Sequence, residues 1–194
     1  MTLDRAKALA DANLNQIEIS FDGLSLHSHE ESRGLGTYIR AYQAVHHAHQ
    51  AGIQRVGMVW TIHTGNLSEL TSLPGFMREL GITECYISLF KKTGLNGAQA
   101  PFNSVNAEAV QIIRQQVNEW KTTFPELTVV LLPACSCGRT SVVIGHNGDV
   151  RLCSFSYESV GNIYRNKLKE IWQSLETTLP ETGPLGYCTA IKVQ

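Results

Sequence analysis

Cysteine thiols are the reactive side chains whose spacing in this chain is most informative. Four of the five cysteines fall in the last third of the 194 residues: Cys135, Cys137, Cys153 and Cys188. Cys137 precedes and Cys153 follows a segment whose Asn147-Gly148 pair predicts a hairpin turn, so both thiols are expected at one end of the hairpin. Four thiolates suit a tetrahedral zinc ion or an iron–sulfur cluster. The alternative is that one or two of them are buried thiols, because free cysteine packs as a small hydrophobe.

Other potentially reactive side chains favour structural roles. Cys85 lies in an apolar strand pattern and is expected in the core. Asp22 follows a predicted strand, where it could bind a ribose hydroxyl or start the turn; the turn is favoured. The histidines at 27, 29, 46, 47 and 49 accompany no HExxH frame, so we expect surface or capping roles for them.

The elements that must position these groups alternate along the chain. Apolar periodicity predicts strands at 16–21, 55–62, 84–90 and 127–132, and helices at 3–12, 37–51, 67–80 and 104–122. The stretch at 24–36 is polar and is expected to be a loop. Because a helix usually crosses between parallel strands, this order predicts an α/β fold with a parallel sheet. Beyond Pro133 a hairpin at 141–152 and a helix at 166–179 predict a separate small α+β module.

Composition excludes several classes of function. The net charge is −1, with no long basic run, which argues against an electrostatic nucleic-acid binder. Hydrophobic residues make up 43% of the chain, enough for a sizeable core, yet no apolar stretch approaches the roughly 20 residues that span a bilayer. Residues 1–13 lack the apolar centre of a secretion signal. We therefore expect a soluble, cytoplasmic protein that binds neither nucleic acid nor membrane.

Five short motifs follow one another in the last third of the chain: Cys137-Gly138, Gly148-Asp149-Val150, Cys153, Gly161-Asn162-Ile163 and Ile171-Trp172-Gln173-Ser174. With these motifs, residues 137–174 resemble the SPASM domain of radical SAM enzymes. The resemblance implies an iron–sulfur site rather than zinc.

The preceding residues resemble the second half of a radical SAM barrel. The matching segments are 17–23, the loop ending at 29–34, Gly36-Thr37-Tyr38, Thr61 and Asn66. The resemblance predicts a partial (β/α) barrel of about three βα units over 1–132, followed by a SPASM-like iron–sulfur domain over 133–194. It also implies that Ser20 and Arg33 contact S-adenosylmethionine. A hydroxyl at a strand's carboxyl end faces the ligand crevice, and a guanidinium suits a carboxylate.

The chain also departs from the family pattern. It contains no Cys-x3-Cys-x2-Cys motif, whose thiolates would hold the catalytic cluster, and no Gly-Gly-Glu segment. By resemblance it is the back half of an enzyme. At most one auxiliary [4Fe-4S] cluster fits the thiols at 135, 137, 153 and 188, and whether Cys135 or Cys137 ligates it stays open. The edge strand at 16–21 and an apolar inner face are expected to be exposed, so an N-terminal half or self-association would cover them.

The resemblance implies radical-based modification of a peptide or protein with S-adenosylmethionine, in partnership with the missing catalytic half. Cofactor-biosynthesis members of the family share these motifs, so the substrate stays open. The alternative is a non-enzymatic iron–sulfur or zinc module that binds peptides or transfers electrons. A third possibility is a degenerate fragment without a function of its own.

Overall fold

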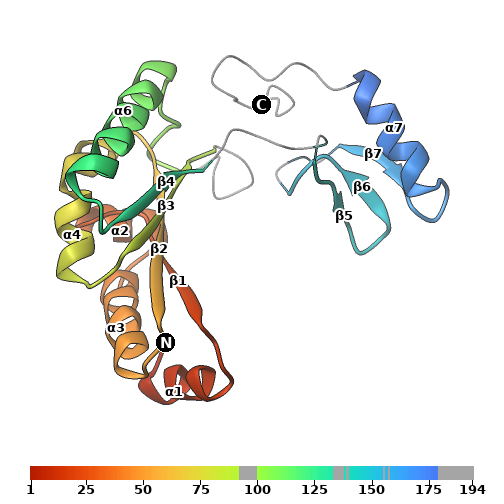
Figure 1. Cartoon of the computed structure of the whole chain (residues 1–194). Coiled ribbons are helices and arrows are strands. Elements are labelled where there is room, and N and C mark those ends of the chain that lie inside the picture. The colour runs from red at the N-terminus through yellow and green to blue at the C-terminus, as the bar shows by residue number, and fades with distance from the viewer. Residues whose placement is uncertain (92–99, 133–137, 139, 155, 157, 179–194) are drawn as a thin grey trace. The chain divides into compact units, whose positions relative to one another are not determined.

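The computed structural model describes residues 1–91, 100–132, 138, 140–154, 156 and 158–178. These residues form two compact units, one within 1–132 and one between 138 and 178 (Figure 1). No helix in the described ranges is both long and apolar enough to cross a bilayer.

The first unit is a four-stranded parallel sheet with the order β1-β2-β3-β4. Its strands are β1 (Gln16–Phe21), β2 (Arg55–Ile62), β3 (Glu84–Leu89) and β4 (Thr128–Leu131). Its helices are α1 (Leu3–Asp11), α2 (Leu26–Arg33), α3 (Thr37–Gln50), the 3-10 helix η1 (Leu67–Ser72), α4 (Leu73–Glu79) and α6 (Ala107–Thr123). The predicted α/β class and parallel sheet are confirmed.

One face of this sheet packs against helices and forms the core. Figure 1 shows α3, α4 and α6 on the same side of the sheet. Alternate strand residues point to that side because the side-chain period of a strand is two. The buried ones are Ile19, Phe21, Val56, Met58, Trp60, Ile62, Cys85, Ile87 and Val129. Cys85 is fully buried among them, as expected from its apolar strand, and desolvation raises the pKa of its thiol.

The opposite face is polar, and the expectation of an apolar inner face is wrong. Registered positions of adjacent strands share a face, which places Glu18, Gly57 and Glu84 in one row and Ser20, Val59 and Tyr86 in the next. Strand residues on this side alternate with the core residues, and most of them, unlike Gly57 and Val59, carry a carboxylate or a hydroxyl. β1 is an edge strand of the sheet, as predicted.

The stretch predicted as a loop at 24–36 contains a helix, α2. Ser25 caps it, accepting a hydrogen bond from the Ser28 backbone N–H at 3.3 Å, and the Ser28 hydroxyl donates to Glu69 Oε1 at 2.7 Å. Only Ser28 and His29 of this helix are buried. Because both are polar, the helix has no apolar stripe that sequence periodicity could detect.

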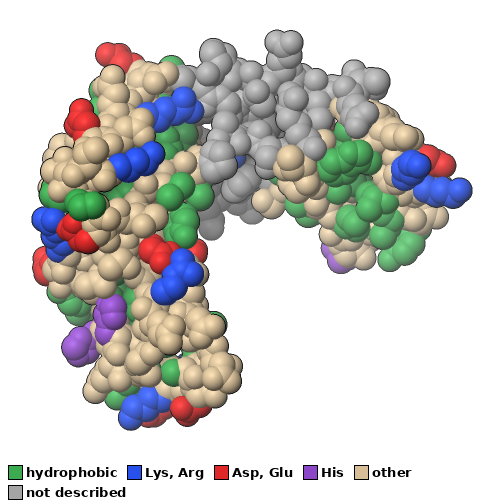
Figure 2. Space-filling view, viewed as in Figure 1, with side chains coloured by type: hydrophobic (Ala, Val, Ile, Leu, Met, Phe, Trp, Pro, Cys, Tyr) green, Lys and Arg blue, Asp and Glu red, His purple; other side chains and the backbone are tan. Residues whose placement is uncertain are grey.

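The second unit is an antiparallel sheet with one helix. Its strands, in the order β5-β6-β7, are β5 (Val143–Ile144), β6 (Asp149–Arg151) and β7 (Ser159–Asn162), and α7 (Leu168–Thr178) packs on β7. The predicted hairpin is present as β5 and β6, whereas β7 was not expected. Figure 2 shows hydrophobic side chains gathered on this unit. Its exposed large hydrophobic residues are Ile144, Ile163, Tyr164 and Leu168.

Candidate functional site

Asp22, directly after β1, joins the carboxyl ends of two strands to the end of α2. Its Oδ2 accepts a hydrogen bond from Arg33 Nε at 2.6 Å, and its Oδ1 accepts one from the Thr61 backbone N–H at 3.3 Å. Its role therefore extends beyond starting a turn. Arg33 is the last residue of α2, where a cation also interacts favourably with the helix dipole.

Ser20 lies on the polar face of β1, two residues before Asp22. Because Arg33 of α2 pairs with Asp22, Ser20 and Arg33 lie at the same edge of the sheet. Thr61 and Ser88 occupy registered positions on this face of β2 and β3. Hydroxyls and a guanidinium at one edge of a parallel sheet are donors that suit a polar, anionic ligand.

Asn66 is completely buried and connects the loops that follow β1 and β2. Its amide nitrogen donates to the Asp22 carbonyl oxygen at 2.7 Å and to the Thr61 carbonyl oxygen at 2.9 Å. Its Oδ1 accepts from the His63 backbone N–H at 2.8 Å. One side chain therefore forms hydrogen bonds with three backbone groups.

Two buried histidines support the same edge. His29 is 1% exposed and its Nδ1 accepts from the Asp22 backbone N–H at 3.3 Å, so the expected surface or capping role is wrong for this residue. His63, also 1% exposed, was not singled out from the sequence. Burial lowers the pKa of both imidazoles. A histidine directly after an apolar strand was the signal that could have identified His63.

The other predicted histidines behave as expected. His46 is exposed, His47 Nδ1 lies 2.9 Å from the Met1 carbonyl oxygen, and His49 Nε2 lies 3.0 Å from that of Leu80. The His49 contact is a capping role, because Leu80 is the C-cap of α4, whereas the His47 contact is to the residue before the N-cap of α1.

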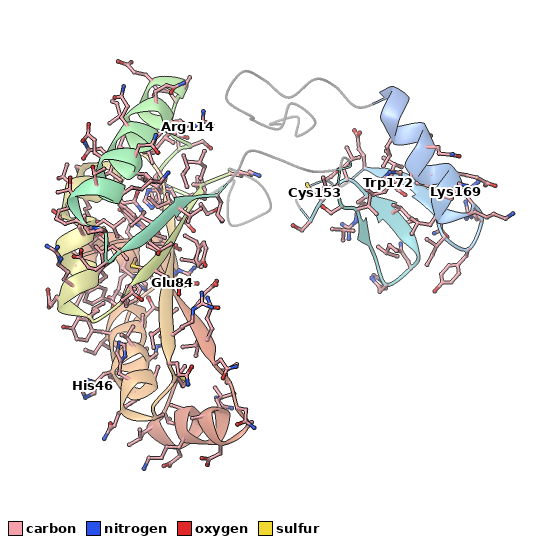
Figure 3. All side chains as sticks on the ribbon, viewed as in Figure 1. His46, Glu84, Arg114, Cys153, Lys169 and Trp172 are labelled. Carbon is pink, nitrogen blue, oxygen red and sulfur yellow. The ribbon has the colours of Figure 1, made fainter. Side chains whose placement is uncertain are left out.

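The second candidate site is the cysteine group of the second unit. Cys153 is 8% exposed and lies just after β6, with its carbonyl oxygen accepting from the Ser156 backbone N–H at 3.2 Å. Figure 3 labels Cys153 at the end of this sheet and Trp172 on α7. Cys135, Cys137 and Cys188 lie outside the described residues, and within the described ones no three potential ligands come together. A buried thiol at the hairpin end has the donor chemistry that an iron–sulfur cluster needs.

The remaining motif residues of this unit build the scaffold behind Cys153. A Cβ at Gly161 would lie 2.8 Å from Ile171 side-chain carbons, so α7 packs directly on the backbone of β7. Asn162 Nδ2 donates to Asp149 Oδ1 at 2.9 Å and to the Asn147 carbonyl oxygen at 3.0 Å. These contacts tie the hairpin turn to β7 and fix the strand that leads to Cys153.

Residues 135–180 match the family model of the SPASM iron–sulfur cluster-binding domain. This match covers the hairpin, β7, α7 and three of the four predicted ligands, Cys135, Cys137 and Cys153.

Relatives extend the likeness over the whole chain. An AdoMet-dependent heme synthase of Oleidesulfovibrio alaskensis is 23% identical over 97% of this chain and 58% of its own length. Among solved structures, Streptococcus suis SuiB bound to S-adenosylmethionine covers 88% of this chain and 43% of SuiB, with 13% identity and a TM-score of 0.59.

Two peptide complexes share the fold. SuiB bound to its precursor peptide SuiA gives a TM-score of 0.59 with 13% identity, over 81% of this chain and 42% of SuiB. anSMEcpe with bound AdoMet and Cp18Cys peptide gives 0.57 with 15% identity, over 89% of this chain and 55% of that protein. The chain spans about half the length of the relatives it matches. Together these similarities support a relationship to the C-terminal part of radical SAM/SPASM proteins.

Proposed function

We propose that residues 133–194 bind one auxiliary [4Fe-4S] cluster through thiols drawn from Cys135, Cys137, Cys153 and Cys188. The observation that carries this proposal is the SPASM match over 135–180. It is supported by the burial of Cys153 at the end of β6, because a cluster thiolate in an enclosed site is shielded from water. Whether Cys135 or Cys137 completes the set is part of the test.

Residues 1–132 are assigned to the barrel part that faces S-adenosylmethionine. Arg33 binds the carboxylate of the ligand through its free guanidinium nitrogens, and the Ser20 hydroxyl hydrogen-bonds to it from β1. Bound S-adenosylmethionine would accept one electron from a reduced catalytic cluster, lose methionine through cleavage of its C5′–S bond, and so supply a 5′-deoxyadenosyl radical that takes hydrogen from a substrate. The ligands of the catalytic cluster come from a Cys-x3-Cys-x2-Cys segment outside this sequence.

We assign a peptide or protein as the substrate class. The support is that two structures of this fold are complexes with peptides, SuiB with SuiA and anSMEcpe with Cp18Cys. A second candidate is a step of cofactor synthesis, favoured by the similarity to an AdoMet-dependent heme synthase.

The cluster assignment is tested by purifying the chain without oxygen and measuring iron, sulfide and zinc with a visible spectrum. About four irons and four sulfides per chain are expected. Cys153→Ala removes them, whereas the matched control Cys85→Ala, which changes a thiol buried in the first unit, retains them. Cys135→Ala and Cys137→Ala separate the two alternatives for the remaining ligand.

A different metal content contradicts this assignment. Zinc alone, or no metal in a folded chain, leaves the non-enzymatic binding module as the better description. S-adenosylmethionine binding is measured separately by calorimetry. Arg33→Gln and Ser20→Ala weaken it by roughly tenfold each if both side chains bind the ligand.

A further inference from the structure

We propose that Asp22 is a positioning residue that fixes the orientation of the Arg33 guanidinium. The inference rests on the proposed role of Arg33 in binding S-adenosylmethionine. In this proposal Asp22 does not contact S-adenosylmethionine but determines the orientation in which Arg33 binds it.

All four polar groups of Asp22 are engaged within the protein. Its N–H donates to His29 Nδ1 and its carbonyl oxygen accepts from Asn66 Nδ2. One carboxylate oxygen accepts from the Thr61 backbone and the other from Arg33 Nε. A carboxylate held in this way is a rigid part of the scaffold, so a role toward Arg33 fits better than direct contact with a ligand.

The contact with Arg33 leaves the binding end of the guanidinium free. Asp22 takes only Nε, at 2.6 Å, and the two Nη groups form no hydrogen bond with the described residues. The Arg33 side chain is 39% exposed and that of Asp22 14%. Because a guanidinium is planar, fixing Nε fixes the plane in which the Nη groups present their hydrogens to a carboxylate.

The backbone that carries Arg33 is also anchored. Ser32, its neighbour, has its Oγ 3.0 Å from His63 Nε2. Gly65 N–H donates to His63 Nδ1 at 3.1 Å, so the ring proton lies on Nε2 and is donated to the Ser32 hydroxyl. The end of α2 is therefore attached at two adjacent residues, Ser32 to the loop after β2 and Arg33 to the residue that follows β1. Preorganisation of this kind reduces the entropy that is lost when Arg33 binds a ligand.

The test compares Asp22→Asn with the wild-type full chain. Asparagine keeps an acceptor for the Thr61 N–H but cannot accept from Arg33 Nε. Side-chain ¹⁵N NMR should show a protected Arg33 Nε–H signal in the wild type, identified by its loss in Arg33→Gln. Asp22→Asn abolishes the protection, and S-adenosylmethionine affinity falls by roughly tenfold.

The double variant separates positioning from direct contact. If Asp22 acts through Arg33, Asp22→Asn lowers affinity no further in an Arg33→Gln background. A full additional loss in that background overturns the proposal. Glu31→Gln is the matched control, since it removes an exposed carboxylate of the same helix and leaves both the Nε–H signal and the affinity unchanged.

The outcomes for the two proposals can be distinguished. A wild-type chain that does not bind S-adenosylmethionine contradicts the proposed role of Arg33, while the Nε–H signal still tests the role of Asp22. An Nε–H signal that is equally protected in wild type and Asp22→Asn shows that Asp22 does not fix Arg33.

Discussion

His63 Nε2 lies 3.0 Å from Ser32 Oγ, although the two residues are 31 positions apart in the chain. The His63 ring also stacks on Phe102, with 3.6 Å between ring centroids and 16° between ring planes. Ser32 belongs to the helix after β1, His63 follows β2, and Phe102 comes from the connection after β3. One neutral imidazole thus holds together the segments that follow three adjacent strands, at the edge where Ser20 and Arg33 lie.

Lowering the pH should therefore reduce the free energy of unfolding, because protonation of His63 is unfavourable in the folded state. Burial lowers the pKa of His63 and His29 in the folded state, so the unfolded chain binds protons more readily. Their contribution to the free energy of unfolding is complete above about pH 6.5 and is lost as the pH falls toward the lowered folded values. In denaturant titrations at about pH 7.5 and 5.5, His63→Gln should show a smaller pH-dependent loss than the wild type.

Exposed histidine provides the control for this experiment. His46→Gln should keep the pH-dependent loss of the wild type, because the His46 side chain is exposed. Equal pH dependence of wild type and His63→Gln would show that protonation of His63 does not destabilise the fold.

Replacing Asn66 should be more damaging than any change of an exposed amide. Asn66→Ala leaves the Asp22 and Thr61 carbonyl oxygens and the His63 N–H without their partner in a completely buried site. Each such group costs about 1–3 kcal/mol, so a loss of about 3 kcal/mol or more in the free energy of unfolding is expected from urea denaturation. Asn118→Ala, which removes an exposed amide from α6, should change it little.

The parallel α/β order could be predicted because its signals are local. Apolar runs of strand length alternate with helical periodicity, and Gly52 and Gly81, which end two of the helices, take φ angles of +79° and +65°. α2 was missed because a helix that buries only Ser28 and His29 has no apolar stripe. β7 was missed because its register depends on pairing with β6 across a β-bulge rather than on its own four residues.

The site was only partly visible in the sequence. Ser20 and Arg33 came from a family resemblance, and the structure places both at the same edge. Asn66 was one of the residues that matched the family pattern. Its structural role could not be predicted, because one of its hydrogen-bond partners, Asp22, lies 44 positions away in the chain. Buried polar side chains are identified by the groups that satisfy them, which composition and periodicity do not reveal. The predicted cluster ligands other than Cys153 lie outside the described residues.

Glu84, on the polar face of β3, should contribute more to stability than an exposed carboxylate. Arg55 donates to it through Nε at 2.6 Å and Nη2 at 2.8 Å, and Tyr86 OH and Gln16 Nε2 donate at 3.2 and 3.3 Å (Figure 3 labels Glu84). Its side chain is 13% exposed, although that of Arg55 is 54% exposed, which screens the pair. Glu84→Gln should therefore lower the free energy of unfolding by about 1 kcal/mol at neutral pH.

A second ion pair provides the comparison. Glu126 pairs with Arg78, and both side chains are about half exposed, so Glu126→Gln should cost less than Glu84→Gln. Hydrogen bonds from Arg55 lower the pKa of Glu84, so its contribution is present above the ordinary carboxyl pKa and is lost as the pH falls through the lowered value. Equal losses for the two variants at neutral pH would show that the extra donors of Glu84 add nothing.

Gly161 should tolerate no side chain, because α7 packs on its backbone. A Cβ there would lie 2.8 Å from two carbons of Ile171, a side chain that is itself buried at 4% exposed. Gly161→Ala should destabilise the second unit by about 1–3 kcal/mol, measured by calorimetry as a lower unfolding temperature. Iron content after anaerobic purification should fall with it, because β7 and α7 support the hairpin that ends at Cys153.

Gly75→Ala is the matched control: a Cβ in that helical position meets nothing within 4 Å, so stability should be unchanged or slightly higher. If Gly161→Ala unfolds at the wild-type temperature, contact between Ile171 and the β7 backbone does not stabilise this unit.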